Sequence, residues 1–350
     1  MPSTNIDYLI VGQGLAGSLL SYKLLSGGAS IMVFDSKHHQ SATRVAAGII
    51  NPITGHRWNL TQDFFKHLST ARTLYTEIES SLNCKLFSAI PQSRLIKNKG
   101  QAEFFQKRLN QPDYQALLEL SCEPCFVDAG FASAAVAQSY RVDSRALIEK
   151  TANYLNSQHS LCHEKFDYTE LKVFEGGIRY KKYRAKKIIF CEGFQALSNP
   201  WLQHLPFKLA KGSVLELKIS GKAGIDMDEQ KLLNWGHWLI LDKGGSARLG
   251  STYDWNDTSD VRAQENQEKL LASLQKYTNI KAHISAHETG VRPTTKQRKP
   301  FVGSLSNLEH AYCLNGLGSK GCLIAPHYVA LLEQHIKEGS PMPDEVCQWI

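Results

Sequence analysis

Residues 6–35, IDYLIVGQGLAGSLLSYKLLSGGASIMVFD, decide the fold of this chain. An apolar run typical of a buried strand ends at Val11 and leads directly into Gly12-Gln13-Gly14-Leu15-Ala16-Gly17. A stretch with helical periodicity follows, and a second apolar run closes on Asp35. A lone glycine motif is weak evidence. Strand, glycines, helix, strand and terminal acid in this order, within about thirty residues, predict a dinucleotide-binding unit.

Each residue type in this unit has a physical role. Gly12 permits the tight turn, Gly14 lets the backbone approach a pyrophosphate, and Gly17 lets the helix pack closely on the strand. The helix N-terminus offers free N–H groups to the diphosphate. Asp35 can accept hydrogen bonds from the ribose hydroxyls, and its charge disfavours a 2′-phosphate. The alternative is a glycine-rich turn without a ligand. It is disfavoured, because three glycines lower the stability of the fold and, without a ligand, neither they nor the acid would serve a purpose.

The glycine motif fits NAD and FAD equally, and later segments favour FAD. Residues 43–52, TRVAAGIINP, are rich in small side chains that let the backbone pass close to a flat ring, whereas a plain NAD dehydrogenase continues to alternate strand and helix. Residues 186–191 predict a buried strand that ends at Glu192-Gly193. Residues 312–314 predict a strand that leads into residues 315–321, NGLGSKG, followed by a helix.

With these pieces in place, the chain resembles the FAD-dependent D-amino acid oxidase family, which includes glycine oxidase and sarcosine oxidase. The resemblance covers nearly the whole chain and rests on the order and spacing of several segments. They are the dinucleotide motif, Ala46-Ala47-Gly48, residues 211–215 (KGSVL), residues 249–253 (LGSTY), residues 290–293 (GVRP) and residues 316–321 (GLGSKG).

The last of these segments is similar to the flavin domain of the bifunctional enzyme that completes a wobble-uridine modification in tRNA. The position of Lys320 is usually arginine there. Two residues depart from the family pattern: Glu192 stands where alanine is more common, and Arg44 stands where a small residue is common. These departures put local flavin contacts in doubt and leave the expected fold unchanged.

The resemblance implies an α/β fold in which a Rossmann-like FAD-binding domain is interleaved with a substrate domain built on a mixed or antiparallel sheet. The predicted FAD-binding domain comprises residues 1–60, 130–207 and 290–350, and the predicted substrate domain comprises residues 61–129 and 208–289. Periodicity predicts helices over 63–81, 264–277 and about 322–337, a helical stretch over 101–120 broken by Pro112, and strands over 213–219, 238–242 and 246–253.

The resemblance also implies a set of FAD-contacting residues. They are Gly12, Gly14, Leu15, Ala16, Gly17, Asp35, Ser36, Arg44, Ala46, Ala47, Gly48, Phe166, Gly193, Gly316, Leu317, Gly318, Ser319, Lys320 and Gly321.

The family's chemistry is hydride transfer from a C–H beside an amine to the flavin N5, with the flavin carrying the difficult step. The expected function is therefore oxidation of the C–N bond of a small amino acid or N-substituted amino acid. Arg292 matches the arginine that binds the substrate carboxylate in amino-acid-oxidising members; the alternative is a structural salt bridge. Lys320 would stabilise negative charge on the reduced flavin, or be a solvated lysine. Tyr253 would line the active site, or be a core tyrosine.

Further residues have weaker assignments. His56, Arg57 and Trp58 border the expected substrate mouth, although surface or packing roles are favoured. Lys211 lies near the flavin or in solvent. The Cys122-x-x-Cys125 pair lacks a second pair at zinc spacing, so chance spacing is favoured over a metal or redox site. The remaining histidines, including His38-His39, are unclustered, and no metal is predicted.

Composition limits the other properties. Eight scattered cysteines and an N-terminus without a basic region predict a cytoplasmic protein with reduced thiols, and no apolar run approaches a membrane span of about 18 residues. The net charge of +7 permits an acidic small substrate or RNA. A small amine or amino acid is the favoured partner. The alternative is a modified tRNA, for which Lys97, Lys99, Lys107, Arg108 and the basic residues of 179–187 offer surfaces. A flavin-bound sensor or subunit without turnover is a third possibility.

Overall fold

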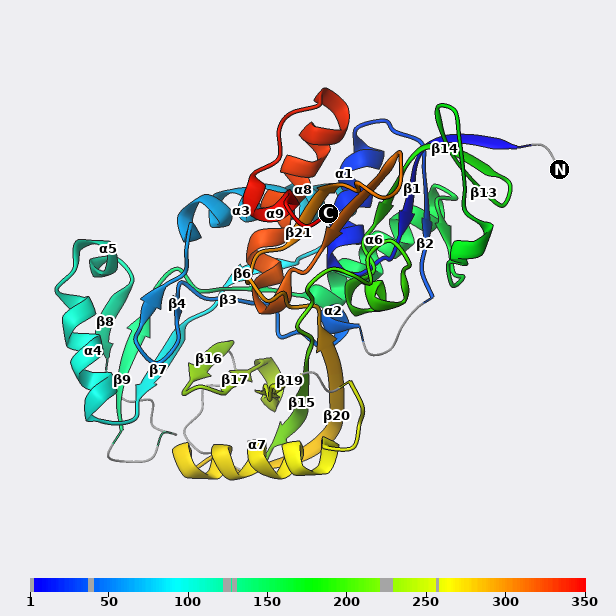
Figure 1. Ribbon diagram of the computed structural model, residues 1–350. Helices are drawn as coiled ribbons and strands as arrows, with labels where there is room; N and C mark the ends of the chain where they lie inside the picture. The colour runs from blue at the N-terminus through cyan, green and yellow to red at the C-terminus, as the bar shows by residue number, and fades with distance from the viewer. Residues whose placement is uncertain (1–2, 37–40, 122–126, 128–130, 221–228, 256–257) are drawn as a thin grey trace.

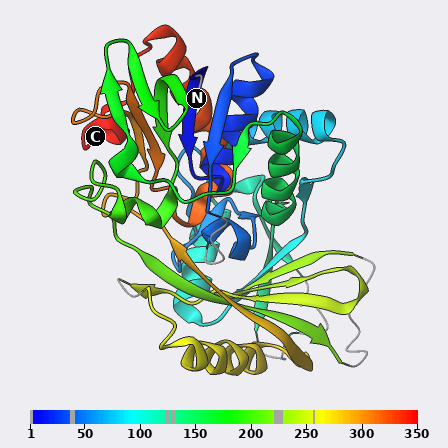
Figure 2. The ribbon, with the colours of Figure 1, turned by 90° about the vertical axis from the view of Figure 1, so that its right-hand side faces the viewer.

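The computed structural model describes residues 3–36, 41–121, 127, 131–220, 229–255 and 258–350. Two large sheets dominate it, one around the dinucleotide motif and one beside it (Figures 1 and 2). The mixed α/β architecture with parallel and antiparallel strands confirms the predicted fold class.

The first sheet has eight strands and a parallel centre. Along its main path the order is β11-β2-β1-β14-β13-β12, with β22 also pairing with β14 and β21 pairing with β22. β1 pairs in parallel with both β2 and β14, as a doubly wound nucleotide-binding sheet requires. The strand bounds are β1 Thr4–Val11, β2 Ile31–Phe34, β11 Leu161–Cys162, β12 Lys172–Phe174, β13 Gly177–Tyr180, β14 Tyr183–Phe190, β21 Phe301–Ser304 and β22 Ala311–Asn315.

Helices cover the first sheet and share one core. α1, α3, α6 and α8 contribute Leu19, Leu68, Leu147 and Leu332 to a single buried cluster. Figure 1 shows α1, α3 and α8 lying together beside the sheet. The bounds are α1 Leu15–Ser26, α3 Phe64–Leu82, α6 Ser144–Ser157, α8 Gly321–Glu338 and α9 Asp344–Cys347.

Pro326 lies inside α8 without ending it. A proline has no N–H to donate to the carbonyl four residues earlier, which here belongs to Cys322. The hydroxyl of the fully buried Tyr75, in α3, donates to that carbonyl at 2.9 Å. A side chain from another helix thus replaces the hydrogen bond that Pro326 cannot make.

The second sheet is largely antiparallel and lies beneath the first in Figure 2, with α7 on its outer side. β15 and β20 are long and run from the cofactor side of the molecule down to α7 (Figure 1). The order is β19-β15-β18-β17-β16-β7-β9-β8, with β20 also pairing with β15. The bounds are β7 Gln92–Ile96, β8 Leu118–Ser121, β9 Ala132–Val136, β15 Ala210–Ile219, β16 Lys231–Asn234, β17 Trp238–Leu241, β18 Ser246–Gly250, β19 Asp254–Trp255, β20 Ala282–Arg292 and α7 Ala263–Tyr277.

Smaller elements lie within and between the two sheets. Their bounds are α2 Ala42–Val45, β3 Ile49–Ile50, β4 Ile53–Thr54, β5 Asn59–Leu60, β6 Phe87–Ala89, α4 Lys99–Leu109, α5 Pro112–Gln115, β10 Tyr140–Val142 and the 3-10 turns Tyr168–Glu170, Gly193–Ser198, Lys243–Gly245 and Gly318–Lys320.

The structure follows the expected elements closely. Pro112 begins α5 at its first position, where its missing N–H costs nothing, so the predicted break is present. The structure differs from the expected elements in two places. The helical stretch predicted over 101–120 ends at Gln115, and residues 118–120 belong to β8. The strand predicted over 246–253 ends at Gly250, and Tyr253 lies in the connection between β18 and β19. The residue limits of the two domains stay a prediction; α3, placed in the substrate domain by that division, packs against α8.

Candidate cofactor and substrate site

The glycine motif folds as a tight turn between β1 and α1. Gly12 has φ 97°, a conformation that side chains disfavour, and a Cβ there would lie 2.5 Å from the carbonyl oxygen of Cys191. A Cβ on Gly17 would lie 1.8 Å from the Gly12 carbonyl oxygen. At Gly14 the nearest atom to a Cβ would be the Thr43 hydroxyl oxygen, 3.5 Å away. The turn is therefore closed against the protein and open at Gly14, where a diphosphate would approach.

Asp35 ends β2 beside this turn. Its Oδ2 accepts a hydrogen bond from the backbone N–H of Gln13 at 2.7 Å. Sequence reasoning assigned this carboxylate to the ribose alone, and the contact with Gln13 adds a second role, because it also braces the glycine turn. Thr43, which sequence reasoning did not single out, accepts from the N–H of Leu15 at 3.0 Å.

A cavity of about 1160 Å³ extends from the glycine turn to the second sheet. It brings together most of the predicted cofactor residues and all three predicted catalytic ones. The predicted residues that line it are Gly12, Gly14, Leu15, Ala16, Asp35, Ser36, Arg44, Ala46, Ala47, Gly48, Phe166, Gly193, Tyr253, Arg292, Leu317, Gly318, Ser319, Lys320 and Gly321.

Two predicted residues lie outside the cavity lining, Gly17 and Gly316. Gly17 instead permits the close approach of α1 to the Gly12 carbonyl. Gly316 has φ 77°, and a Cβ there would lie 2.6 Å from the Thr295 side chain. Both glycines shape the backbone next to the cavity.

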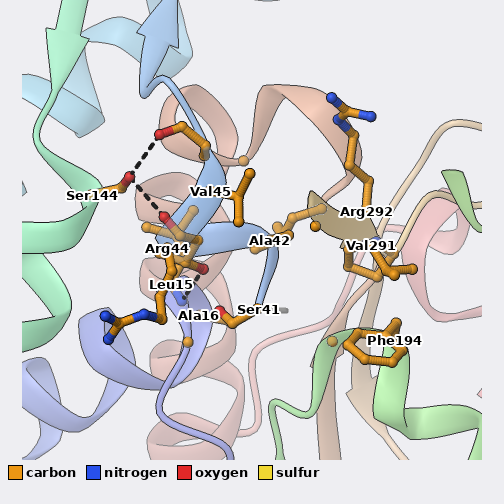
Figure 3. Close-up of a pocket in the computed structure, with 18 of the residues that line it drawn as sticks. Leu15, Ala16, Ser41, Ala42, Arg44, Val45, Ser144, Phe194, Val291 and Arg292 are labelled. Atoms are coloured by element: carbon orange, nitrogen blue, oxygen red, sulfur yellow. Dashed lines mark hydrogen bonds between the residues drawn. The ribbon is translucent and has the colours of Figure 1, made fainter. Parts of the chain in front are cut away.

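The segment after α2 passes along the cavity with free amides. Gly48 has φ 72°, and a Cβ there would lie 1.8 Å from the carbonyl oxygen of Val142, so only glycine fits. Within the described residues, the backbone N–H groups of Ala47 and Gly48 have no acceptor, and both residues line the cavity. Figure 3 shows the neighbouring Arg44 and Val45 on this wall.

Aromatic and acidic residues line the cavity beside the glycine turn. Phe166 is buried and stacks on Tyr180 with ring centroids 4.1 Å apart. Glu192 accepts hydrogen bonds from the Tyr168 hydroxyl and from Asn199 Nδ2, the latter at 2.7 Å. Burial raises the pKa of Glu192 to about 7, although both hydrogen bonds act to lower it. The sequence identified Glu192 only as a departure from the family pattern. Its hydrogen-bond partners Tyr168 and Asn199 are brought next to it by the fold, so no local pattern could have predicted them.

Arg292 ends β20 at the second-sheet side of the cavity (Figure 3). Its guanidinium carbon lies 4.3 Å from the ring centroid of Tyr253, and its Nη1 donates to the Thr252 carbonyl at 3.2 Å. Among the described residues no carboxylate lies within 4.0 Å of Arg292, which argues against a structural salt bridge. Burial lowers its pKa, yet an arginine stays protonated at neutral pH. Tyr253 is 46% exposed, so it is no core residue.

Lys320 lies at the start of α8 and is half-buried rather than solvated. Its Nζ donates to the Thr61 hydroxyl at 3.3 Å, and the part of the chain that the structure describes offers it no carboxylate partner. Burial and the charge of Arg298 lower the pKa of Lys320. Arg292 and Lys320 thus both bring positive charge to the cavity, and neither has a carboxylate within salt-bridge distance in the described ranges.

The structure also places the weaker candidates. His56 and Arg57 are exposed on the β4–β5 hairpin, whereas Trp58 is fully buried, consistent with the surface and packing roles favoured. Lys211 is 3% exposed and donates to the carbonyls of Thr258 and Ser259 and to Asp260, so solvation of this lysine was a wrong alternative.

Cys122, Cys125, His38 and His39 lie outside the described residues. Across the described ranges, no three histidine, cysteine or acidic side chains gather as a metal site would require. No helix among those ranges combines the length and apolar character needed to cross a membrane.

The residues present fit FAD. The glycine turn and Asp35 match a diphosphate and a ribose, the free amides of Ala47 and Gly48 offer donors along one wall, and Lys320 offers a positive charge. Asn234 of β16 and Trp238 of β17 also line the cavity. The fold brings them there, and no local sequence pattern indicates such a role for either residue.

Relatives among known proteins agree with this geometry. The uncharacterized oxidoreductase YurR of Bacillus subtilis (strain 168) is 26% identical, over 91% of this chain and 92% of its own length. The tRNA 5-methylaminomethyl-2-thiouridine biosynthesis bifunctional protein MnmC of Hydrogenovibrio crunogenus is 23% identical, over 86% of this chain but only 47% of its own length.

Solved structures share the fold across the whole chain. Iminodiacetate oxidase from Chelativorans sp. BNC1 superposes with a TM-score of 0.80 at 18% identity, covering 98% of each chain. Glycine oxidase from Geobacillus kaustophilus superposes with a TM-score of 0.79 at 15% identity, covering 96% of each chain. The family model described as FAD dependent oxidoreductase (DAO) matches residues 7–332. The chain therefore belongs to the DAO family of FAD-dependent oxidoreductases, as its sequence motifs predicted.

Proposed function

We propose that the chain oxidises the C–N bond of a small amino acid or N-substituted amino acid. The observation that carries this proposal is Arg292, an arginine that lines the cavity without a carboxylate partner among the described residues. A guanidinium offers two parallel N–H donors to a carboxylate and fixes its orientation as well as its position. A substrate held this way has the carbon beside its amine aimed along the cavity.

FAD, when bound, accepts the hydride from the C–H beside the amine. We assign its diphosphate to the glycine turn, its ribose to Asp35, and its ring system to the wall formed by Ala46, Ala47 and Gly48. Lys320 and the start of α8 would then supply positive charge where the reduced ring becomes negative.

The rest of the cavity supports the same assignment. Tyr253 stacks on the Arg292 guanidinium, and Trp238 adds a second aromatic side chain to the lining of the same cavity. Among proteins of the same fold, glycine oxidase and iminodiacetate oxidase are named for small substrates that contain both an amine and a carboxylate.

Anaerobic bleaching of the flavin tests this proposal. The purified yellow protein is mixed with glycine, N-methyl amino acids, D-amino acids and dicarboxylic imino acids, and the absorbance of the oxidised flavin is followed. Rapid bleaching by at least one carboxylate-bearing amine supports the proposal. Bleaching only by amines that lack a carboxylate would contradict it.

A second candidate is oxidation of an amino-acid-like group on a tRNA base. Three curated relatives are named for tRNA modification, and the match spans about half the length of two of them and 26% of the third. A basic surface also lies close to the cavity. It is formed by Lys99, Lys107 and Arg108 on α4. Arg108 contacts the β4–β5 hairpin, and Thr54 of this hairpin lines the cavity. Arg108 is already bonded to Asn59 and Gln111, which weakens this surface. The same bleaching assay with modified and unmodified tRNA distinguishes the two candidates.

A further inference from the structure

Four successive backbone carbonyls, those of Thr43, Arg44, Val45 and Ala46, are all held by side chains. Because α2 has only four residues, these carbonyls have no partner within the helix. Ser144 Oγ donates to the Thr43 carbonyl at 2.8 Å, and Arg145 Nε donates to the Arg44 carbonyl at 2.8 Å. Figure 3 shows Ser144 reaching two of these carbonyls.

Arg248 holds the remaining two carbonyls. Its Nη2 donates to Val45 and its Nη1 donates to Ala46, both at 3.0 Å. Arg248 comes from β18 of the second sheet and is only 6% exposed. Its planar guanidinium suits this task, because two donors on one rigid fork match two neighbouring carbonyls.

Two glutamates compensate the charge of the arginines. Glu216 Oε1 lies 2.9 Å from both Arg145 Nη2 and Arg248 Nε. Glu288 pairs with Arg145, and its Oε2 lies 3.8 Å from Arg248 Nη2. Burying such charges is costly unless each is paired and hydrogen-bonded, and this cluster meets that condition.

The cluster joins the Thr43–Ala46 segment to the strand that carries Arg292. Glu288 and Arg292 both lie on β20. Between them, a Cβ on Gly290 would lie 3.0 Å from the Val45 Cβ, and Val291 forms a β-bridge with Ser41. The wall assigned to FAD is therefore joined to the strand of Arg292, the residue assigned to the substrate carboxylate, both by packing contacts and by salt bridges.

We propose that Arg248, with Ser144 and Arg145, is a positioning residue that holds the Thr43–Ala46 carbonyls so that the amides of Ala47 and Gly48 face FAD. The link from this wall to Arg292 rests on the proposed function. The positioning of FAD rests on family membership and on the contacts above.

The variants Arg248→Met and Arg248→Lys test the proposal, and Leu270→Ala is the control for a general loss of stability. Leu270 is fully buried in α7, in a separate core cluster, so its truncation lowers stability without touching the segment. Three quantities are measured: the Kd for FAD added to apoprotein, the visible spectrum of the bound flavin, and hydrogen–deuterium exchange of peptides that cover residues 41–50. None requires an amine substrate, so failure of the proposed function would not affect the result.

Arg248→Met is expected to raise the FAD Kd by about tenfold or more, shift the flavin absorption bands and speed exchange in the 41–50 peptides. Arg248→Lys is expected to change the Kd, the spectrum and the exchange less than Arg248→Met does, because lysine keeps the positive charge but lacks the planar pair of donors of the guanidinium. Leu270→Ala should lower Tm and leave the flavin spectrum and the 41–50 exchange as in wild type.

The proposal is overturned if Arg248→Met leaves the FAD Kd and the 41–50 exchange unchanged, or if Leu270→Ala changes them equally. If Arg248→Met fails to fold, Ser144→Ala tests the proposal in its place. It removes the hydroxyl that reaches the Thr43 and Ala46 carbonyls and leaves Arg248 in place. It is expected to raise the FAD Kd and speed the same exchange to a smaller extent. Wild-type values in Ser144→Ala would overturn the proposal.

Discussion

The guanidinium of Arg292 lies directly over Gly212, where no side chain fits. A Cβ on Gly212 would lie 2.4 Å from Arg292 Nη1 and 2.5 Å from Nη2. The two residues face each other because β15 and β20 are paired antiparallel, with Ala210 opposite Arg292. The absence of a side chain at position 212 therefore gives Arg292 its place against the Thr252 carbonyl and the Tyr253 ring.

Gly212→Ala should weaken the carboxylate site and leave FAD in place. The new methyl group displaces the guanidinium, and it also meets the Thr252 carbonyl oxygen at 2.5 Å, which cannot move as easily. We expect KM for a carboxylate substrate to rise about tenfold or more, with kcat less affected. Gly100→Ala is the matched control, since its Cβ would lie 3.6 Å from its nearest neighbour in an exposed helix. Equal kinetics for both variants would show that Gly212 does not shape the site.

Asp35→Ala should weaken FAD binding. One set of charge-assisted hydrogen bonds to the ribose contributes roughly 1.5–3 kcal/mol, or about tenfold to a hundredfold in Kd. Asp35→Asn should lose less, because it keeps an acceptor for the Gln13 N–H. Titration of FAD into each apoprotein gives the Kd values. A wild-type Kd for Asp35→Ala would mean that the glycine motif holds the cofactor without this acid.

The flavin should be held without a covalent bond. Cys191 and Cys322 line the cavity, but both are buried. Burial raises the pKa of Cys322 to about 12 and that of Cys191 further, so neither supplies a thiolate at neutral pH. Acid precipitation is expected to release all yellow colour into the supernatant. Colour retained in the pellet would show that the flavin is covalently attached and contradict the prediction.

Glu192 should make the apoprotein less stable as pH rises. Its folded pKa of about 7 lies above the ordinary value of 4.5, so the folded state binds this proton more tightly than the unfolded state. That contribution is fully present below pH 4.5 and is lost as pH rises through 7; it amounts to about 1–3 kcal/mol. His67, whose pKa burial lowers to about 4, acts in the opposite direction.

Glu192→Gln isolates this effect, because His67 contributes equally to both proteins. The difference in free energy of unfolding between Glu192→Gln and wild type, from denaturant titrations at pH 5 and pH 8, should favour the variant more at pH 8. A difference that stays constant with pH would show that Glu192 does not titrate in this range.

The sequence predicted the cofactor end of the molecule better than the substrate end, for a physical reason. The glycine turn and Asp35 are contiguous, and their backbone requirements allow few residue types, so the pattern is visible along the chain. Arg292 was identified only through the family motif that contains it. Its partner Gly212, and the cavity residues Asn234 and Trp238, come from separate strands whose register no local pattern specifies.

The charge cluster was invisible in the sequence for the same reason. Its four residues lie far apart along the chain. Glu216, Arg248 and Glu288 meet because β15 pairs with both β18 and β20, and Arg145 reaches them from the start of α6. Lys211, for which the sequence left a place near the flavin or in solvent open, shows the converse. A lysine is usually exposed, and only the fold supplies the Asp260 carboxylate and two carbonyls that satisfy it when buried.

The most direct test of the account is the rate of anaerobic flavin reduction in Arg292 variants. It is measured against the concentration of a carboxylate substrate from the bleaching screen, for wild type, Arg292→Ala and Arg292→Lys. Arg292→Ala should cost about 2–4 kcal/mol in transition-state binding, and Arg292→Lys should recover only part, because an ammonium lacks the planar fork. The flavin spectrum before reduction should match wild type in both variants. Reduction as efficient as wild type in Arg292→Ala would contradict the account and favour a substrate without a carboxylate.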